Sequence, residues 1–135
     1  KVLILCTGNS CRSQIAEGLL SYFSANTKVY SAGTKPEKAN PFAIKAMAEM
    51  GIDISKNTSN HADEYANIDF DYVFTVCDNA KEICPIYPKA KQMIHHSFTD
   101  PADATGTQQE QLKVYIEVRN QLRDYFKAFA ENKLS

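Results

Sequence analysis

The feature that most constrains the fold is an uninterrupted apolar run, Val2–Cys6 (VLILC), that leads into a short polar loop and then into a helical pattern. A strand buried on both faces appears in a sequence as such a run, whereas a strand with one wet face alternates apolar and polar residues. From Ser13, which we expect to cap a helix, apolar residues recur at helical spacing. Strand, loop and helix in this order predict a βαβ unit.

Three further segments indicate strands. Residues 28–32 and 70–77 are rich in aromatic and β-branched residues, and residues 91–96 show a weaker pattern of the same kind. Because helical patterns separate most of these segments, the strands are predicted to lie parallel in one sheet with helices on both faces. We therefore expect an α/β fold.

Two more helices are predicted. Asn40 as the cap, Pro41 in the first turn and Gly51 as the stop define the first of them. Residues 109–132 carry apolar side chains at helical spacing and indicate a long amphipathic terminal helix. The stretch from residue 96 to residue 108 is rich in Asp, Thr, Pro and Gly, and we expect it to be a loop.

Length and charge exclude several classes of protein. A chain of 135 residues is most simply one domain, residues 1–135. The formal net charge of −1 provides no basic excess for nucleic acid, and no apolar run reaches the roughly 18 to 20 residues that span a membrane. The first apolar run shows no signal-peptide cleavage site, so we expect a cytoplasmic protein, and we expect a monomer.

The loop after the first strand has the composition of an anion site with a thiol at its start. Backbone N–H groups of such a loop converge with the N-terminus of the following helix, and the donors that bind an oxyanion also stabilise a thiolate. Arg12 adds a planar fork that matches two oxygens of a tetrahedral oxyanion. Cys6 is then the predicted nucleophile. The residues predicted to bind the oxyanion are Thr7, Gly8, Asn9, Ser10, Cys11, Arg12 and Ser13.

Other interpretations of this loop stay open. Cys6 can be a buried strand-end residue and Arg12 a solvated side chain, since the bare spacing CX5R also arises by chance. Cys11 can be a packing residue or can take part in redox chemistry. A protein that binds an oxyanion or senses thiol oxidation without catalysis is a third class.

Cys77 and Cys84 form a second candidate pair. Cys77, like Cys6, is expected at the end of a strand. Ligands of parallel sheets bind at the carboxyl ends of the strands, so Cys77 and Cys6 are predicted to reach the same binding site. In a helix, Cys77 and Cys84 would sit about 10 Å apart along the axis, too far for a disulfide, which needs Cα atoms within about 7 Å. They can pair only if the segment unwinds, and two unrelated half-buried cysteines are the alternative. Neither cysteine pair has CxxC spacing, so no structural zinc is expected.

The motif CTGNSCRS followed by AEG resembles the low-molecular-weight protein tyrosine phosphatase superfamily, and VYSAGT, NPFAIKAMAEMGIDIS and TDPA extend the resemblance over essentially the whole chain. The resemblance implies a three-layer α/β/α sandwich with a four-stranded parallel sheet, and the CX5R loop as its phosphate site. This superfamily holds two chemistries, hydrolysis of phosphomonoesters and reduction of arsenate coupled to thioredoxin. Phosphate or sulfate can also occupy such a loop.

The position of the cysteine pair resembles the thioredoxin-coupled arsenate reductases of the superfamily. The resemblance implies that Cys6 attacks arsenate, that Cys77 then attacks Cys6 and releases arsenite, and that Cys84 attacks Cys77. Thioredoxin would reduce the resulting disulfide, and no bound cofactor is implied. One dithiol supplies the two electrons that arsenate needs, whereas hydrolysis needs none.

Asp100 is the predicted proton donor. A carboxylic acid above the oxyanion can protonate the departing oxygen, and Pro101 stiffens the loop that carries it. The resemblance supports this role, although Ala102 stands where the phosphatases have an aromatic residue. The sequence therefore favours an arsenate reductase in which Ser13 also steadies the Cys6 thiolate. A low-molecular-weight phosphatase that uses a phosphocysteine is the alternative.

A potassium ion is the other group that the resemblance raises. Some reductases of the superfamily bind it beside the loop, at positions that match Asn9, Glu17 and a Thr-Ser-Asp stretch. This chain has Thr58 and Ser59 followed by Asn60, so one carboxylate of that set is missing.

Overall fold

A four-stranded parallel sheet forms the centre of the computed structural model, which describes residues 1–9, 11–77 and 90–134. The strand order is β2-β1-β3-β4, and every neighbouring pair is parallel. β1 has a partner on both sides, in agreement with its uninterrupted apolar sequence. The four predicted strands are confirmed: β1 Val2–Cys6, β2 Val29–Gly33, β3 Phe70–Thr75 and β4 Ala90–His95.

The prediction that Cys77 ends a strand is wrong by two residues. β3 pairs with β1 as far as Thr75 opposite Leu5, and the N–H of Val76 still donates to the carbonyl of Leu5 at 3.0 Å. Since β1 itself ends at Cys6, the ladder has no further partner beyond this point. Cys77 remains fully buried just past the end of the strand.

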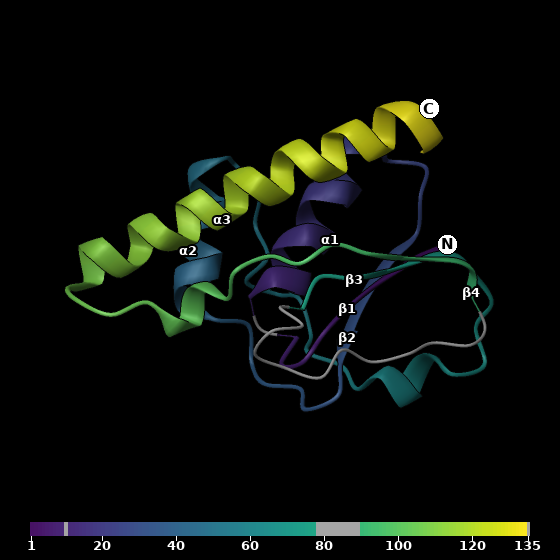
Figure 1. The fold of residues 1–135 in the computed structure, drawn as a ribbon, viewed down its shortest axis with the longest axis horizontal. Helices are drawn as coiled ribbons and strands as arrows, with labels where there is room; N and C mark the ends of the chain where they lie inside the picture. The colour runs from purple at the N-terminus through teal and green to yellow at the C-terminus, as the bar shows by residue number, and fades with distance from the viewer. Residues whose placement is uncertain (10, 78–89, 135) are drawn as a thin grey trace.

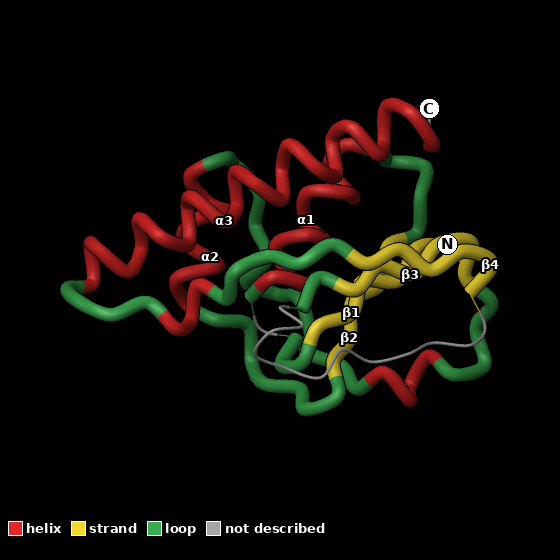
Figure 2. The backbone as a smooth tube through the Cα atoms, in the orientation of Figure 1, coloured by secondary structure: helices red, strands yellow, loops and turns green. Residues whose placement is uncertain are grey.

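Three α-helices lie on one side of the sheet, and the short 3-10 helix η1 lies on the other (Figures 1 and 2). Among the described residues, a 3-10 helix rather than an α-helix therefore covers the second face. The fold class is confirmed as an α/β sandwich around a four-stranded parallel sheet. The helices are α1 Arg12–Phe23, α2 Pro41–Glu49, α3 Gln108–Phe129 with a π-helical end at η3 Ala130–Leu134, and η1 Ala62–Tyr65.

Apolar side chains pack on both faces of β1, as its sequence predicts. Val2, Ile4 and Cys6 join the core between the sheet and the α-helices, which also contains Ile15 and Phe126. The alternate residues of the strand join a smaller core on the opposite face. None of the described helices is long and apolar enough to cross a membrane.

The signals at the ends of α2 are confirmed, but the one at the start of α1 is wrong. Asn40 caps α2 through Oδ1, which accepts from the N–H of Phe42 at 2.8 Å, and Gly51 turns the chain away with φ of +79°. α1 begins at Arg12, one residue before the expected cap, and no side chain caps it. Ser13 lies inside the helix because its hydroxyl is engaged with Cys6 and Asn9.

The segment expected to be a loop between β4 and α3 contains one helical turn, η2 Pro101–Asp103. Asp100 caps this turn, since its Oδ1 accepts from the N–H of Ala102 at 3.0 Å. Thr107 and Glu110 form a capping box at the start of α3. Both ends of the segment are thereby fixed, and Asp100 is held at its start.

Candidate active site

A cavity of about 210 Å³ opens where β1 meets α1. Its walls come from four segments: the loop after β1, the start of α1, the chain after β2, and the turn that begins at Asp100. The structure thus brings Asp100 together with the predicted site residues of the loop, such as Cys6 and Arg12, which lie far from it in the sequence. The cavity is lined by Cys6, Thr7, Gly8, Cys11, Arg12, Lys35, Glu37, Asp100 and Ala102.

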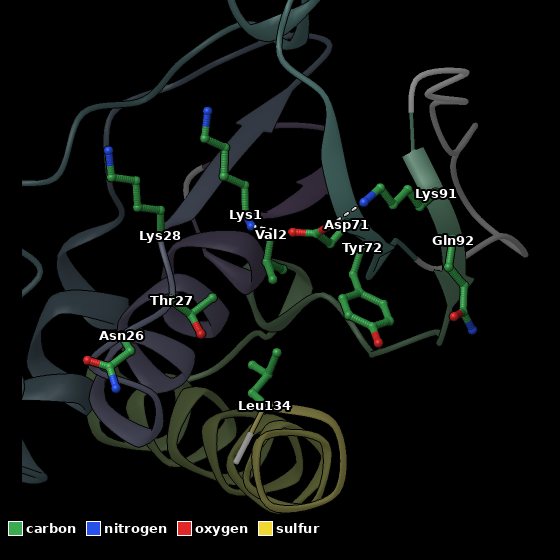
Figure 3. Close-up of a pocket in the computed structure, with 10 residues that line it drawn as sticks. All are labelled: Lys1, Val2, Asn26, Thr27, Lys28, Asp71, Tyr72, Lys91, Gln92 and Leu134. Atoms are coloured by element: carbon green, nitrogen blue, oxygen red, sulfur yellow. Dashed lines mark hydrogen bonds and ion pairs between the residues drawn. The ribbon is translucent and has the colours of Figure 1, made fainter.

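A larger cavity, of about 560 Å³, lies at the amino ends of the strands (Figure 3). Asp71 lies there between the amino group of Lys1, at 2.8 Å, and the ammonium of Lys91, at 3.2 Å. The residues that line it include neither a cysteine nor an arginine. Size alone therefore does not identify the reactive cavity of this molecule.

The sulfur of Cys6 is surrounded by hydrogen-bond donors. The N–H of Asn9 donates to it at 3.3 Å, and the hydroxyl oxygen of Ser13 lies 2.9 Å away. Ser13 Oγ also accepts from Asn9 Nδ2 at 2.8 Å, and when Cys6 is a thiolate the Ser13 hydroxyl is the group that donates between the two. Donors of this kind stabilise a thiolate, so the expected contact between Ser13 and Cys6 is present.

The carbonyl oxygens of the loop are bonded to segments outside it. Thr7 O accepts from the N–H of Lys35 at 2.9 Å, and Gly8 O accepts from the N–H of Glu37 at 2.8 Å. Asn9, with a left-handed φ of 49°, turns its own carbonyl to Ser59 Oγ at 3.1 Å. With these oxygens held away from the thiol, the loop presents N–H groups instead, as an anion site requires.

Gly33 makes this anchoring of the loop sterically feasible. A Cβ at Gly33 would collide with the carbonyl oxygen of Thr7 and would lie 3.0 Å from both the nitrogen of Asn9 and the carbonyl oxygen of Cys6. Gly33 is the last residue of β2, and no role was predicted for it from the sequence. A glycine at a strand end also marks close backbone approach, and that was the available signal.

Arg12 is buried beside the cavity and is held from the opposite wall. Its Nη1 donates to the carbonyl of Phe98 at 3.1 Å, and its Nη2 lies 3.5 Å from Asp100 Oδ2. Asp100 is partly exposed, whereas Arg12 is almost fully buried. The guanidinium of Arg12 and the carboxyl group of Asp100 thus line the same cavity as the thiol. The guanidinium is suited to bind a tetrahedral oxyanion, and the carboxyl group is suited to protonate a leaving oxygen.

Of the other three cysteines, the structure describes Cys11 and Cys77. Cys77 Sγ lies 4.0 Å from the carbonyl oxygen of Leu5, the residue before Cys6. Cys11 is buried in the loop, 3.9 Å from the hydroxyl of Tyr115. Burial, with Cys11 and Asp100 nearby, raises the pKa of Tyr115. Ser10 and Cys84 lie outside the described residues.

The family comparison decides what kind of protein carries this site. The family described as "Low molecular weight phosphotyrosine protein phosphatase" matches residues 1–134. The chain belongs to this family. An arsenate reductase of Halalkalibacterium halodurans is 45% identical over 131 residues, which cover 96% of this chain and 94% of that protein.

Solved structures in the same family resemble the chain over nearly its whole length. A structure described as an arsenate reductase in the phosphate binding state is 30% identical, with a TM-score of 0.81, and the match covers 96% of this chain and 95% of that one. A structure described as an arsenate reductase in oxidized state is 29% identical, with a TM-score of 0.83, and the match covers 99% of this chain and 98% of that one.

Behind the loop, this member of the phosphatase family has a buried polar network that sequence analysis found only in part. Asn9 Nδ2 donates to Ser31 Oγ at 2.9 Å, and Ser31 Oγ donates to Glu17 Oε1 at 2.9 Å. Asn57 Nδ2 donates to Glu17 Oε2 at 2.8 Å. Burial raises the pKa of Glu17, partly opposed by its hydrogen bonds with Ser31. The participation of Ser31 and Asn57 depends on long-range packing, which no local pattern revealed.

The same network includes the positions at which the family resemblance raises a potassium ion. Both carboxylate oxygens of Glu17 already accept from protein donors. Asn60, which stands in place of the missing acid, accepts from Thr58 Oγ1 at 2.7 Å and donates to Glu64 at 3.2 Å. A potassium ion here would have to share these oxygens with the protein donors. Within residues 1–9, 11–77 and 90–134, no cluster of three or more His, Cys, Asp or Glu side chains is placed to hold a metal.

Proposed function

We propose that this protein is an arsenate reductase that uses Cys6 as its nucleophile and takes its electrons from thioredoxin. The observation that carries the proposal is a buried thiol from outside the loop, Cys77, against the carbonyl of Leu5 and hence beside the end of the strand that bears Cys6. A phosphatase needs one thiol, because hydrolysis transfers no electrons. The relative at 45% identity, described as an arsenate reductase, supports the same conclusion.

In the first step, arsenate binds between the loop N–H groups and the guanidinium of Arg12. The Cys6 thiolate, held by the Ser13 hydroxyl and the Asn9 N–H, attacks arsenic and forms a sulfur–arsenic bond. One arsenic–oxygen bond breaks, and the oxygen leaves as water after it takes a proton from Asp100. Arsenic is still in its +5 state at this point.

In the second step, the Cys77 thiolate attacks the sulfur of Cys6. A disulfide forms, the sulfur–arsenic bond breaks, and its electron pair stays with arsenic, which leaves as arsenite. Two thiols lose two electrons, and arsenic gains two. The short path from Cys77 to the end of β1 favours this attack.

In the third step, Cys84 attacks Cys77 and frees Cys6, and thioredoxin reduces the Cys77–Cys84 disulfide by a dithiol exchange that returns both thiols. The role of Cys84 rests on its spacing and on the family resemblance. No bound cofactor enters the scheme. The proposal places a monomeric enzyme in the cytoplasm, where thiols are kept reduced.

A phosphatase is the second candidate, because Cys6, Arg12 and Asp100 would serve hydrolysis equally and the matching family is described as phosphatases. The described residues that line the cavity are charged, polar or small, and none is aromatic. Ala102 stands where an aromatic wall would pack against a phosphotyrosyl ring. The phosphatase proposal therefore has less support.

One coupled assay separates these functions. The protein is mixed with arsenate, thioredoxin, thioredoxin reductase and NADPH, and the loss of NADPH is followed. We expect turnover by the wild type and none by Cys6→Ser, Cys77→Ser or Cys84→Ser. Equal activity of the wild type and Cys84→Ser, or no turnover by either, would overturn the relay. A phosphatase would hydrolyse an aryl phosphate without thioredoxin and would tolerate the loss of Cys77 or Cys84, whereas a sensor would turn over neither substrate.

A further inference from the structure

One wall of the reactive cavity is a short segment that carries two opposite charges, Lys35 and Glu37. Both side chains are exposed, and both line the cavity. Their backbone N–H groups donate to Thr7 O and Gly8 O, within the loop itself. These hydrogen bonds hold the backbone of Lys35 and Glu37 in place beside the loop, although this segment belongs to no helix or strand.

The charges around the cavity make this wall important for binding. Arg12 lies 3.5 Å from Asp100, so part of its positive charge is already balanced by a carboxyl group. An oxyanion that enters must also approach a thiolate at Cys6, which repels it. Among the described residues that line the cavity, Lys35 is the second cation and Glu37 the second acid.

We propose that Lys35 and Glu37 determine the affinity of this site for small tetrahedral oxyanions, Lys35 by attracting the anion to the loop and Glu37 by opposing it. The inference deepens the proposed function, since it rests on an inorganic oxyanion as the substrate. Lys35 acts at the mouth of the cavity, where a charge changes the local concentration of a doubly charged ligand. The negative charge of Glu37 lowers that local concentration, so the two side chains have opposite effects on oxyanion binding.

The test measures the electrostatic potential at Cys6 without turnover. Alkylation of Cys6 by iodoacetate, an anion, is compared with alkylation by iodoacetamide, which is neutral, and mass spectrometry assigns the labelled cysteine. The ratio of the two rates reports the potential at the thiol, because the reagents differ mainly in charge. The affinity for phosphate, an oxyanion that does not oxidise the thiols, is measured in the same way, by protection of Cys6 from iodoacetamide.

Three variants give a matched set. Lys35→Met should lower the rate ratio about two- to threefold, the size expected for one charge several ångströms away across water, and should weaken phosphate binding. Glu37→Gln should raise the ratio and tighten binding by a similar factor. Lys38→Met, which removes an exposed lysine outside the cavity lining, should leave both unchanged. The differences should shrink in 0.5 M salt, since about 0.1 M already screens charges over about 10 Å.

An unchanged ratio in folded Lys35→Met, or an equal change in Lys38→Met, would overturn the assignment. Circular dichroism checks that each variant is folded. Because alkylation needs neither thioredoxin nor reduction, its outcome is separate from that of the coupled assay. If the reductase assay fails while the ratio shifts as described, the reductase proposal falls and the two charges still control oxyanion binding.

Discussion

The hydroxyl oxygen of Ser13 lies 2.9 Å from the sulfur of Cys6 and at the same time accepts a hydrogen bond from Asn9 Nδ2 at 2.8 Å. Asn9 is itself held, because its Oδ1 accepts from the N–H of Asn60 and its second amide hydrogen goes to Ser31. Asn9 thus fixes the Ser13 hydroxyl beside the sulfur, where it donates to Cys6 whenever Cys6 is a thiolate.

Ser13→Ala should lower the rate of Cys6 alkylation and the kcat for arsenate reduction by about tenfold or more, because a hydrogen bond to a charged group contributes about 1.5–3 kcal/mol. The variant should also lose some stability, because Asn9 Nδ2 loses a buried acceptor, so both rates are measured under conditions where the variant is folded. The matched control is Ser21→Ala, an exposed serine of the same helix. Equal activity of the two variants would show that Ser13 does not stabilise the thiolate.

Gly33→Ala should cost activity in the folded molecule. A methyl group there collides with the carbonyl of Thr7, so the loop must move, at a cost of about 1–3 kcal/mol. Gly51→Ala is the comparison: its Cβ meets no atom within 4 Å, but its φ of +79° makes a side chain unfavourable by about 1–2 kcal/mol. We expect both variants to lower the free energy of unfolding and only Gly33→Ala to lower kcat, measured under conditions where each protein is folded.

Asp100→Asn should reduce kcat about 100-fold or more, because the variant cannot donate a proton to the leaving oxygen. Asparagine keeps the oxygen that accepts from the N–H of Ala102, so η2 should stay capped and stability should change little. Asp103→Asn, in the same turn, is the control. If the activity of Asp100→Asn fell only in proportion to the fraction of folded protein, Asp100 would serve the fold and not the reaction.

Glu17 should make stability depend on pH. Burial raises its pKa in the folded state above the usual value of 4.5, so folding favours the protonated carboxyl group. The stability that Glu17 contributes is fully present below the pKa of Glu17 in the unfolded chain, and it is lost as pH rises through the pKa of Glu17 in the folded protein. Urea unfolding from pH 4 to pH 8 should therefore show a steeper decline for the wild type than for Glu17→Gln, whereas Glu117→Gln, an exposed control, should follow the wild type. Parallel curves for all three proteins would contradict this assignment.

The strands and helices could be predicted because each depends on a local pattern. The run Val2–Cys6, the cap at Asn40 and the stop at Gly51 each carry their signal within a few residues. Ser13 shows the limit of this approach. A serine before an apolar repeat looks like a cap, and only the left-handed Asn9 and its amide orientation place the hydroxyl on Cys6 instead.

The site was predictable where one segment contains it and unpredictable where distant segments meet. Cys6 and Arg12 flank one loop, so their spacing, with a strand before it and a helix after it, indicated an oxyanion site. Lys35 and Glu37 reach that loop through backbone hydrogen bonds to Thr7 and Gly8, and Asn57 reaches Glu17 of α1; no periodicity in the sequence records those contacts.

The bonds from Lys35 and Glu37 to the loop carbonyls have a consequence for measurements of motion. Their amide hydrogens lie in an exposed segment, yet each is held by an oxygen of the loop at 2.9 Å and 2.8 Å. Such hydrogens exchange with solvent only when the bond opens. Deuterium uptake at these two amides would therefore report how often the oxyanion loop opens, in a resting protein with no substrate and no thioredoxin present.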